Sequence, residues 1–225
     1  MLDDLPGTPA FCPVVRLTEE VRQALAFDLS AVLGELDSRF GADVLARSAA
    51  WLTFNEPRAS FALEREPDRP SDVQRFAAAL AAHCGQIESP LSTESLGLLQ
   101  RAVLGARALR LGLRRSPVFA GSAAAFDATV VRHIGPHWRD LDALLDGLRA
   151  LDAQTAQGPA GLSATAHALL RAAALSFGFV YLQPLADGNG RLHRFLINDT
   201  LARAGLLPAG VVIPDLVDDH EVRHL

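Results

Sequence analysis

Two apolar segments joined by a glycine-containing turn decide the fold: ATAHALLRAAALSFGFVY (164–181), LQPLADGNG (182–190) and RLHRFLINDTLARAG (191–205). The first segment is apolar almost all round, which predicts a helix at the centre of the core. The last segment has Leu192, Phe195, Leu196 and Leu201 on its inward side, and Gly205 is its predicted end. The turn therefore connects two core helices.

The rest of the chain predicts an all-α fold, because alanine and leucine recur at spacings of three and four residues. Each predicted helix is expected to bury one face in the core. An isolated hairpin is marginal in water, so the one predicted hairpin must lie against the helical body. The predicted elements are a helix capped by Thr18 and apolar as far as Leu36, helices from Ser71 to Gly85 and from Ser92 to Leu111 (ended by Gly112), the hairpin over 117–134, and a helix containing Leu141 to Leu148.

Composition limits the class of protein. With 225 residues, 49% of them hydrophobic, we expect a single domain over residues 1–225. A net charge of −5 argues against a nucleic-acid-binding protein. The two cysteines, Cys12 and Cys84, have no disulfide or zinc spacing. The sequence shows no signal peptide and no apolar run of about eighteen residues, so we expect no membrane span and a cytoplasmic location.

The turn between the two core helices has the composition of an anion site. Gly188 and Gly190 allow backbone conformations in which successive N–H groups converge on a phosphate. The positive end of the following helix lies behind them, and Arg191 and Arg194 offer forked donors near the start of that helix. Asp187 supplies a hard oxygen suited to Mg²⁺. Asp-Gly and Asn-Gly are also common turn dipeptides, so the stretch from Asp187 to Gly190 alone is equally compatible with an ordinary turn.

The full stretch QPLADGNGRLHR (183–194) resembles the signature loop of the Fic family, His-Pro-Phe-x-Asp/Glu-Gly-Asn-Gly-Arg-x-x-Arg. The resemblance covers roughly residues 50 to 214 and implies the Fic fold, a helical bundle with a small β-hairpin flap. In that fold the flap holds a target segment beside the nucleotide through main-chain hydrogen bonds. The implied parts are N-terminal helices in residues 1–90, a Fic core in 91–214, a flap in 117–134 and an active-site loop in 183–194.

The resemblance also implies an activity, the transfer of AMP from ATP to a Ser, Thr or Tyr hydroxyl of a target protein. Asp187 would then hold Mg²⁺, the Gly188, Asn189 and Gly190 backbone would cradle the phosphates, and Arg191 and Arg194 would clamp them. The sequence does not identify the target, and it leaves open whether the chain forms a homo-oligomer.

Gln183 occupies the position of the histidine that takes the hydroxyl proton in the Fic family. A carboxamide does not titrate in the physiological range, so we expect binding of Mg-ATP with impaired transfer. An inactive nucleotide-binding or protein-interaction module on the Fic scaffold is the alternative, and another phosphoryl chemistry is a weaker one. Leu185, where Phe is usual, is a tolerable apolar change.

The segment ASFALER (59–65) is similar to the inhibitory Ser/Thr-x-x-x-Glu motif of the family. Ser60 and Glu64 are its matching residues, and the resemblance implies that Glu64 pairs with Arg194 and displaces the γ-phosphate. Arg65 stands where Gly or Asn is usual, which weakens the assignment.

Two other groups of residues have ordinary explanations. His133 and His137 have the spacing of helical metal ligands, but the Gly-Pro pair between them rules out a regular helix, so packing near Trp138 is favoured. Five arginines between 101 and 115 are expected to form a solvated face. Among them Arg114, nearest the flap, is the one with a candidate role.

Overall fold

The computed structural model describes residues 7–40, 70–105, 111–123, 129–158 and 162–207. The described part is mostly helical, which confirms the all-α prediction. Its elements in chain order are α1 (Glu19–Leu25), α2 (Leu29–Phe40), α4 (Pro70–His83), α5 (Thr93–Leu104), β1 (Phe119–Ala123), β2 (Thr129–Ile134), the 3₁₀ helix η2 (Trp138–Asp140), α6 (Leu141–Gln154), α7 (Ala164–Leu182) and α8 (Asn189–Arg203).

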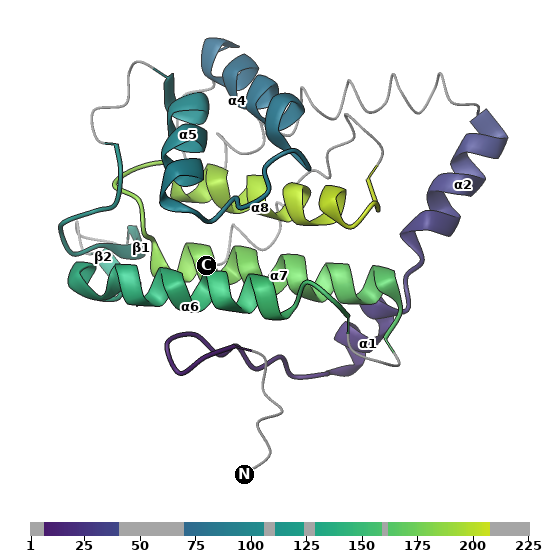
Figure 1. Cartoon of the computed structure of the whole chain (residues 1–225), viewed down its shortest axis with the longest axis horizontal. Helices are drawn as coiled ribbons and strands as arrows, with labels where there is room; N and C mark the ends of the chain where they lie inside the picture. Colours follow the sequence, from purple (N-terminus) through teal and green to yellow (C-terminus); the bar gives the residue numbers. More distant parts are fainter. Residues whose placement is uncertain (1–6, 41–69, 106–110, 124–128, 159–161, 208–225) are drawn as a thin grey trace.

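Helix α7 lies at the centre of the bundle, between α6 and α8, and α4 and α5 cover the other side of α8 (Figure 1). Phe179 of α7, Phe195 of α8 and Phe76 of α4 are completely buried in this core. Helix α7 also has the length and hydropathy of a membrane-crossing helix, 1.3 on average over 18 residues. Its packing against α6 and α8 accounts for that apolar character, because a central helix must be apolar on several sides.

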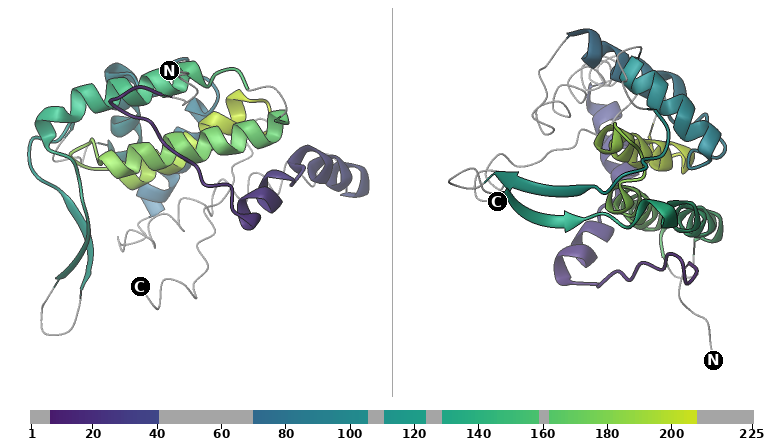
Figure 2. Two further views of the ribbon diagram at one scale, coloured as in Figure 1. Left: turned by 90° about the horizontal axis from the view of Figure 1, so that it is seen from below. Right: turned by 90° about the vertical axis from the view of Figure 1, so that its left-hand side faces the viewer.

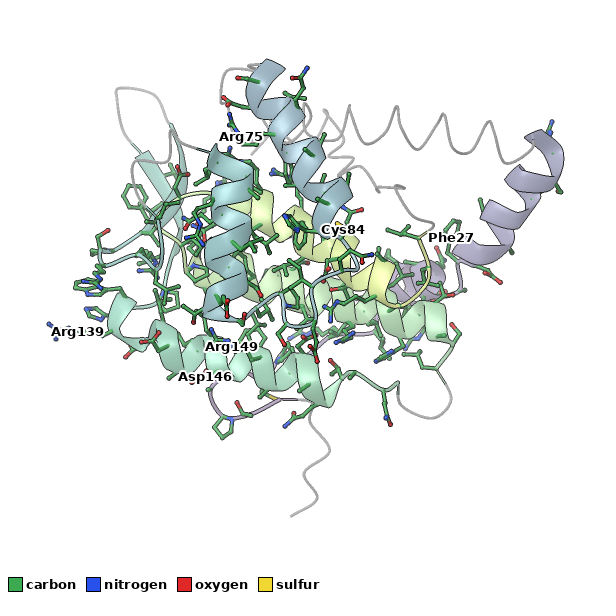
Figure 3. The ribbon with its side chains drawn as sticks, turned by 45° about the horizontal axis from the view of Figure 1, so that its top comes forward. Phe27, Arg75, Cys84, Arg139, Asp146 and Arg149 are labelled. Carbon is green, nitrogen blue, oxygen red and sulfur yellow. The ribbon has the colours of Figure 1, made fainter. Side chains whose placement is uncertain are left out.

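Polar side chains set several helix starts. Ser163 caps α7, its hydroxyl accepting from the N–H of Ala166 at 3.1 Å, and Ser92 caps α5 in the same way. On α6, Arg149 pairs with Asp146 at 2.6 Å and donates to the carbonyl of Leu91 at 2.9 Å (Figure 3). The bond to Leu91 ties α6 to the segment just before α5.

The N-terminal helix prediction is partly wrong. Thr18 caps α1 as expected, but the chain leaves the helix at Ala26, and Asp28 starts α2 by accepting from the N–H of Ala31 at 3.0 Å. Helix α1 buries no residue, and Val32 on α2 is 38% exposed. The apolar face predicted from the sequence is therefore only partly covered here: Val21 and Leu25 of α1 are half-buried, and α1 contacts α7.

Helix α5 ends earlier than predicted, at Leu104 instead of Leu111. Gly105 adopts φ +67°, and the Arg75 side chain from α4 donates to the carbonyl of Leu104 at 3.3 Å. A Cβ at position 105 would lie 2.5 Å from Arg75 Nε. A side chain distant in sequence thus fixes the helix end, so local spacing favoured the wrong glycine.

The predicted hairpin is present as the antiparallel pair β1 and β2, with Phe119 opposite Ile134 and a bulge between Ala120 and Gly121. It extends away from the helices instead of lying against them (Figure 2). Phe119 is 60% exposed and Ile134 is 72% exposed. Of the described residues of the hairpin, those at its base are the ones attached to the bundle, so that part of the prediction is wrong.

One side of α7 near the hairpin is exposed, although the helix lies at the centre of the bundle as predicted. Phe177 and Tyr181 are 60% and 47% exposed, with ring centroids 5.8 Å apart. His133 of β2 lies over Tyr181 at 4.6 Å, and its Nε2 is 2.8 Å from the Tyr181 carbonyl oxygen. These contacts attach β2 to the end of α7.

The N-terminal segment from Gly7 to Phe11 packs between α6 and α7, in a notch formed by two glycines. The N–H of Gly7 donates to the side chain of Gln154 at 2.9 Å, and Phe11 lies over Gly147 and Gly178. A Cβ at Gly178 would be 2.5 Å from the ring of Phe11, so the absence of side chains at these glycines makes room for the aromatic ring.

Candidate active site

The turn after α7 begins with a residue in the left-handed region. Gln183 has φ +47° and ψ +55°, and its N–H donates to the carbonyl of Phe179 at 3.1 Å. It is the one non-glycine residue with positive φ in the described part of the chain. Pro184 follows, so helix α7 cannot continue and the chain turns into the active-site loop.

A short antiparallel bridge holds the turn from one side. Leu113 pairs with Leu185: the N–H of Arg114 donates to the carbonyl of Pro184 at 2.9 Å, and the N–H of Ala186 donates to that of Gly112 at 3.0 Å. The segment that leads into the flap is thus bonded directly to the active-site loop.

Asn189 holds the turn from the other side. Its Oδ1 accepts from the N–H of Leu185, and its Nδ2 donates to the carbonyl of Leu185, both at 2.9 Å. Asn189 is 9% exposed and Leu185 is 2% exposed. The side chain of Asn189 therefore shapes the loop, and what it offers to a ligand is its main-chain N–H.

Gln100 is a third support that sequence reasoning missed. It is completely buried on α5, where its Nε2 donates to the carbonyl of Asp187 at 2.8 Å and its Oε1 accepts from the N–H of Gly112 at 2.7 Å. The sequence did contain a signal for this role, since Gln100 falls on the same helix face as the apolar residues Leu96 and Val103. A polar residue at a core position must be hydrogen-bonded.

Helix α8 starts at the loop with its amide groups uncapped. Gly188 is the N-cap with φ +83°, and among the described residues no side chain caps the helix start. Leu104 lies beneath Gly188, 3.3 Å from where a Cβ would be, which keeps the backbone close to the core. The first N–H groups of a helix have no partner within that helix and carry partial positive charge, so this helix start attracts anions.

The helix start faces a cavity of about 1250 Å³. The cavity is lined by the predicted residues Gln183, Asp187, Gly188, Asn189 and Gly190 and by residues 111–118. The cavity is larger than most small-ligand pockets need, and a nucleotide fits within that volume. The structure thus brings together five predicted site residues around one space.

The two predicted arginines lie on the first two turns of α8 but are not among the described residues lining the cavity. Arg191 and Arg194 are 5% and 6% exposed. Asp187 is exposed at the cavity edge. The proposed inhibitory residues Ser60 and Glu64 lie outside the described residues.

The histidine pair behaves as expected from packing. His137 caps η2 through its Nδ1, 3.2 Å from the N–H of Arg139, and stacks on Trp138 at 3.9 Å. Within the described ranges, no group of three or more His, Cys, Asp or Glu side chains forms a metal site. A cation at Asp187 would therefore need the phosphates of its ligand as partners, as is usual for Mg²⁺.

Comparison with known proteins agrees with this geometry. Residues 90–201 match the Fic/DOC family. The fold is similar to the crystal structure of a Fic family protein from Desulfovibrio desulfuricans G20, with a TM-score of 0.62 and 16% identity over 89% of this chain. The chain spans 64% of the length of that protein. The match and the shared fold together show that this chain carries a domain of the Fic/DOC family in residues 90–201.

Proposed function

We propose that this domain binds Mg-ATP and is built for the transfer of AMP to a Ser, Thr or Tyr hydroxyl of a target protein. The observation that carries the proposal is the helix start at Gly188–Gly190, uncapped and facing a cavity of about 1250 Å³. A loop held by bonds from Asn189, Gln100 and the Leu113 bridge is preorganised, so little entropy is lost when it binds a phosphate chain.

Each loop residue has a proposed task in that complex. The main-chain N–H groups of Gly188, Asn189 and Gly190 bind phosphate oxygens. Asp187 would supply one carboxylate oxygen to Mg²⁺. Arg191 and Arg194 place positive charge behind the loop and clamp the phosphates when these reach the start of α8. When bound, the magnesium ion neutralises charge on the transferred phosphate.

Gln183 limits the transfer step. Its position at the cavity edge suits contact with an incoming hydroxyl, but a neutral amide does not accept the proton. Loss of a general base typically lowers the rate about 10²- to 10⁴-fold, while phosphate binding does not depend on it. We infer slow transfer with retained nucleotide affinity. The target would dock along the flap, where main-chain groups of an edge strand accept an added segment.

Ser60 and Glu64 complete the proposal as an inhibitory segment. Glu64 would form an ion pair with Arg194 and compete with the γ-phosphate for it. ATP affinity would then be higher for Glu64→Gly than for the unaltered chain.

The test combines binding and labelling. Mg-ATP binding is measured by calorimetry for the unaltered chain, Gln183→His, Glu64→Gly and the double variant, and incorporation of labelled AMP is measured for the same four proteins. Asp187→Ala in the double variant is the matched control, expected to abolish the labelling. We expect binding by all four proteins and labelling mainly by the double variant.

Two outcomes would contradict this proposal. Binding without labelling in every variant would favour a nucleotide-binding or protein-interaction module, a reading that the Gln183 substitution itself supports. No binding by the Glu64→Gly protein would refute the nucleotide assignment.

A further inference from the structure

One buried arginine joins both ends of the flap to the active-site loop. Arg114 is 4% exposed. Its Nε donates to the carbonyl of Gln183 at 2.6 Å, and Nη1 donates to that of Ser116 at 2.9 Å. Its Nη2 donates to the carbonyls of Pro136 at 2.6 Å and Leu182 at 3.1 Å. One guanidinium thus binds four carbonyl groups: two at the end of α7, one before β1 and one after β2.

The charge of Arg114 has no carboxylate partner among the described residues, and only carbonyl oxygens accept its hydrogen bonds. Burial lowers the pKa of Arg114, but arginine stays protonated in proteins. The two carbonyls at the end of α7 lie at the negative end of that helix, which favours a cation there. Burying an unpaired charge is costly. An arginine at this place therefore suggests a role beyond ordinary packing.

The arrangement needs the shape of a guanidinium. Its planar fork presents donors in several directions at once, whereas a lysine has one nitrogen with three donors. The surroundings are tight: a Cβ at Gly135 would lie 3.1 Å from Arg114 Nη2 and 2.6 Å from Val118 Cγ1. The N–H of Gly135 donates to the carbonyl of Val118 at 2.9 Å, closing the base of the flap beside the guanidinium.

We propose that Arg114 is a positioning residue that fixes the base of the flap to the active-site loop. A target segment on the flap is then presented at a constant place relative to the phosphate site. The expected benefit for AMP transfer rests on the proposed function, but the attachment of the flap to the active-site loop through Arg114 does not.

The test is native-state amide exchange, measured by NMR on the full chain without nucleotide. The Gly135 amide reports on the base of the flap, and the amide of buried Leu175 in α7 reports on the bundle. The proteins are the unaltered chain, Arg114→Gln, Arg114→Lys and the control Arg115→Gln. Arg115 is exposed and lines the same cavity.

We expect both Arg114 variants to raise the exchange rate of Gly135 relative to Leu175 about ten- to one-hundred-fold, the effect of losing charge-assisted hydrogen bonds. Arg115→Gln should leave the ratio unchanged. Equal acceleration at Gly135 and Leu175 would overturn the proposal, because Arg114 would then contribute only overall stability. Unaltered protection in Arg114→Lys would overturn it as well.

A second variant decides the matter if Arg114→Gln does not fold. Gly135→Ala places a methyl group against both Val118 Cγ1 and the guanidinium, which should loosen the base of the flap, and we expect it to raise the same ratio; an unchanged ratio would contradict the coupling. These measurements are independent of ATP. A chain that fails to bind Mg-ATP would refute the proposed function, while the exchange ratio would still decide the role of Arg114.

Discussion

Replacing Asn189 with alanine should destabilise the protein through the main chain of Leu185. The N–H and carbonyl of Leu185 point away from the Leu113 bridge, and their hydrogen bonds in the described structure are the two 2.9 Å bonds to the Asn189 side chain. A buried main-chain group left without a partner costs about 1–3 kcal/mol. Because the adjoining cavity admits water to one side of the loop, we expect a total loss near the lower end, about 2–3 kcal/mol.

The assay is urea unfolding followed by circular dichroism, with Mg-ATP affinity measured in parallel. Asn189→Ala should lower the unfolding midpoint and weaken ATP binding, since a loop without its internal clamp must be ordered by the ligand. Asn189→Asp retains the acceptor for the Leu185 N–H but places a second oxygen against the buried Leu185 carbonyl, so it should not recover the stability lost in Asn189→Ala. A midpoint for Asn189→Ala equal to that of the unaltered chain would refute this account of the loop.

Three further predictions concern the bundle. Phe11→Ala should lower stability by about 2 kcal/mol by emptying the glycine notch, and Gly178→Ala should cost less in that background than alone, as a double-mutant cycle would show; additive losses would contradict the notch. Thr200→Val should raise the free energy of unfolding by about 1 kcal/mol, because the Thr200 hydroxyl is buried with no hydrogen-bond partner in the described structure; a loss in urea unfolding would contradict this. Burial raises the pKa of Asp199 above its usual 3.8, despite the opposing charge of Arg203, so the folded state holds this proton more tightly and stability falls as pH rises through the raised pKa. The difference in unfolding free energy between the unaltered chain and Asp199→Asn should therefore decrease as pH increases from about 4, and a difference that grows would refute the assignment.

The central helices and the loop were predictable because their signals are local. The apolar run before Gln183 and the pattern after Gly190 predict α7 and α8, and Gly188 with φ +83° explains why glycine stands at that position. The hairpin strands were also predicted, since β-branched residues flank a turn of small residues. The residues that identify the loop in the sequence, such as Gly188, are the ones that set its backbone conformation.

The supports of the loop were less predictable because they come from distant parts of the chain. Gln100 and Arg114 act on carbonyl groups 87 and 69 residues away, at Asp187 and Gln183. No spacing rule connects such positions. The same reason explains the end of α5, which depends on Arg75 from α4. Interactions between elements decided these points, while sequence patterns describe single elements.

The left-handed conformation of Gln183 limits which residues natural variation can place at this position. Asparagine, aspartate and histidine tolerate positive φ comparatively well, whereas valine, isoleucine and threonine are strongly disfavoured there. An exchange at position 183 can therefore keep the loop only if the new side chain is one of a few unbranched ones. The geometry of one peptide unit thus allows the chemistry of this side chain to change while the turn after α7 keeps its shape.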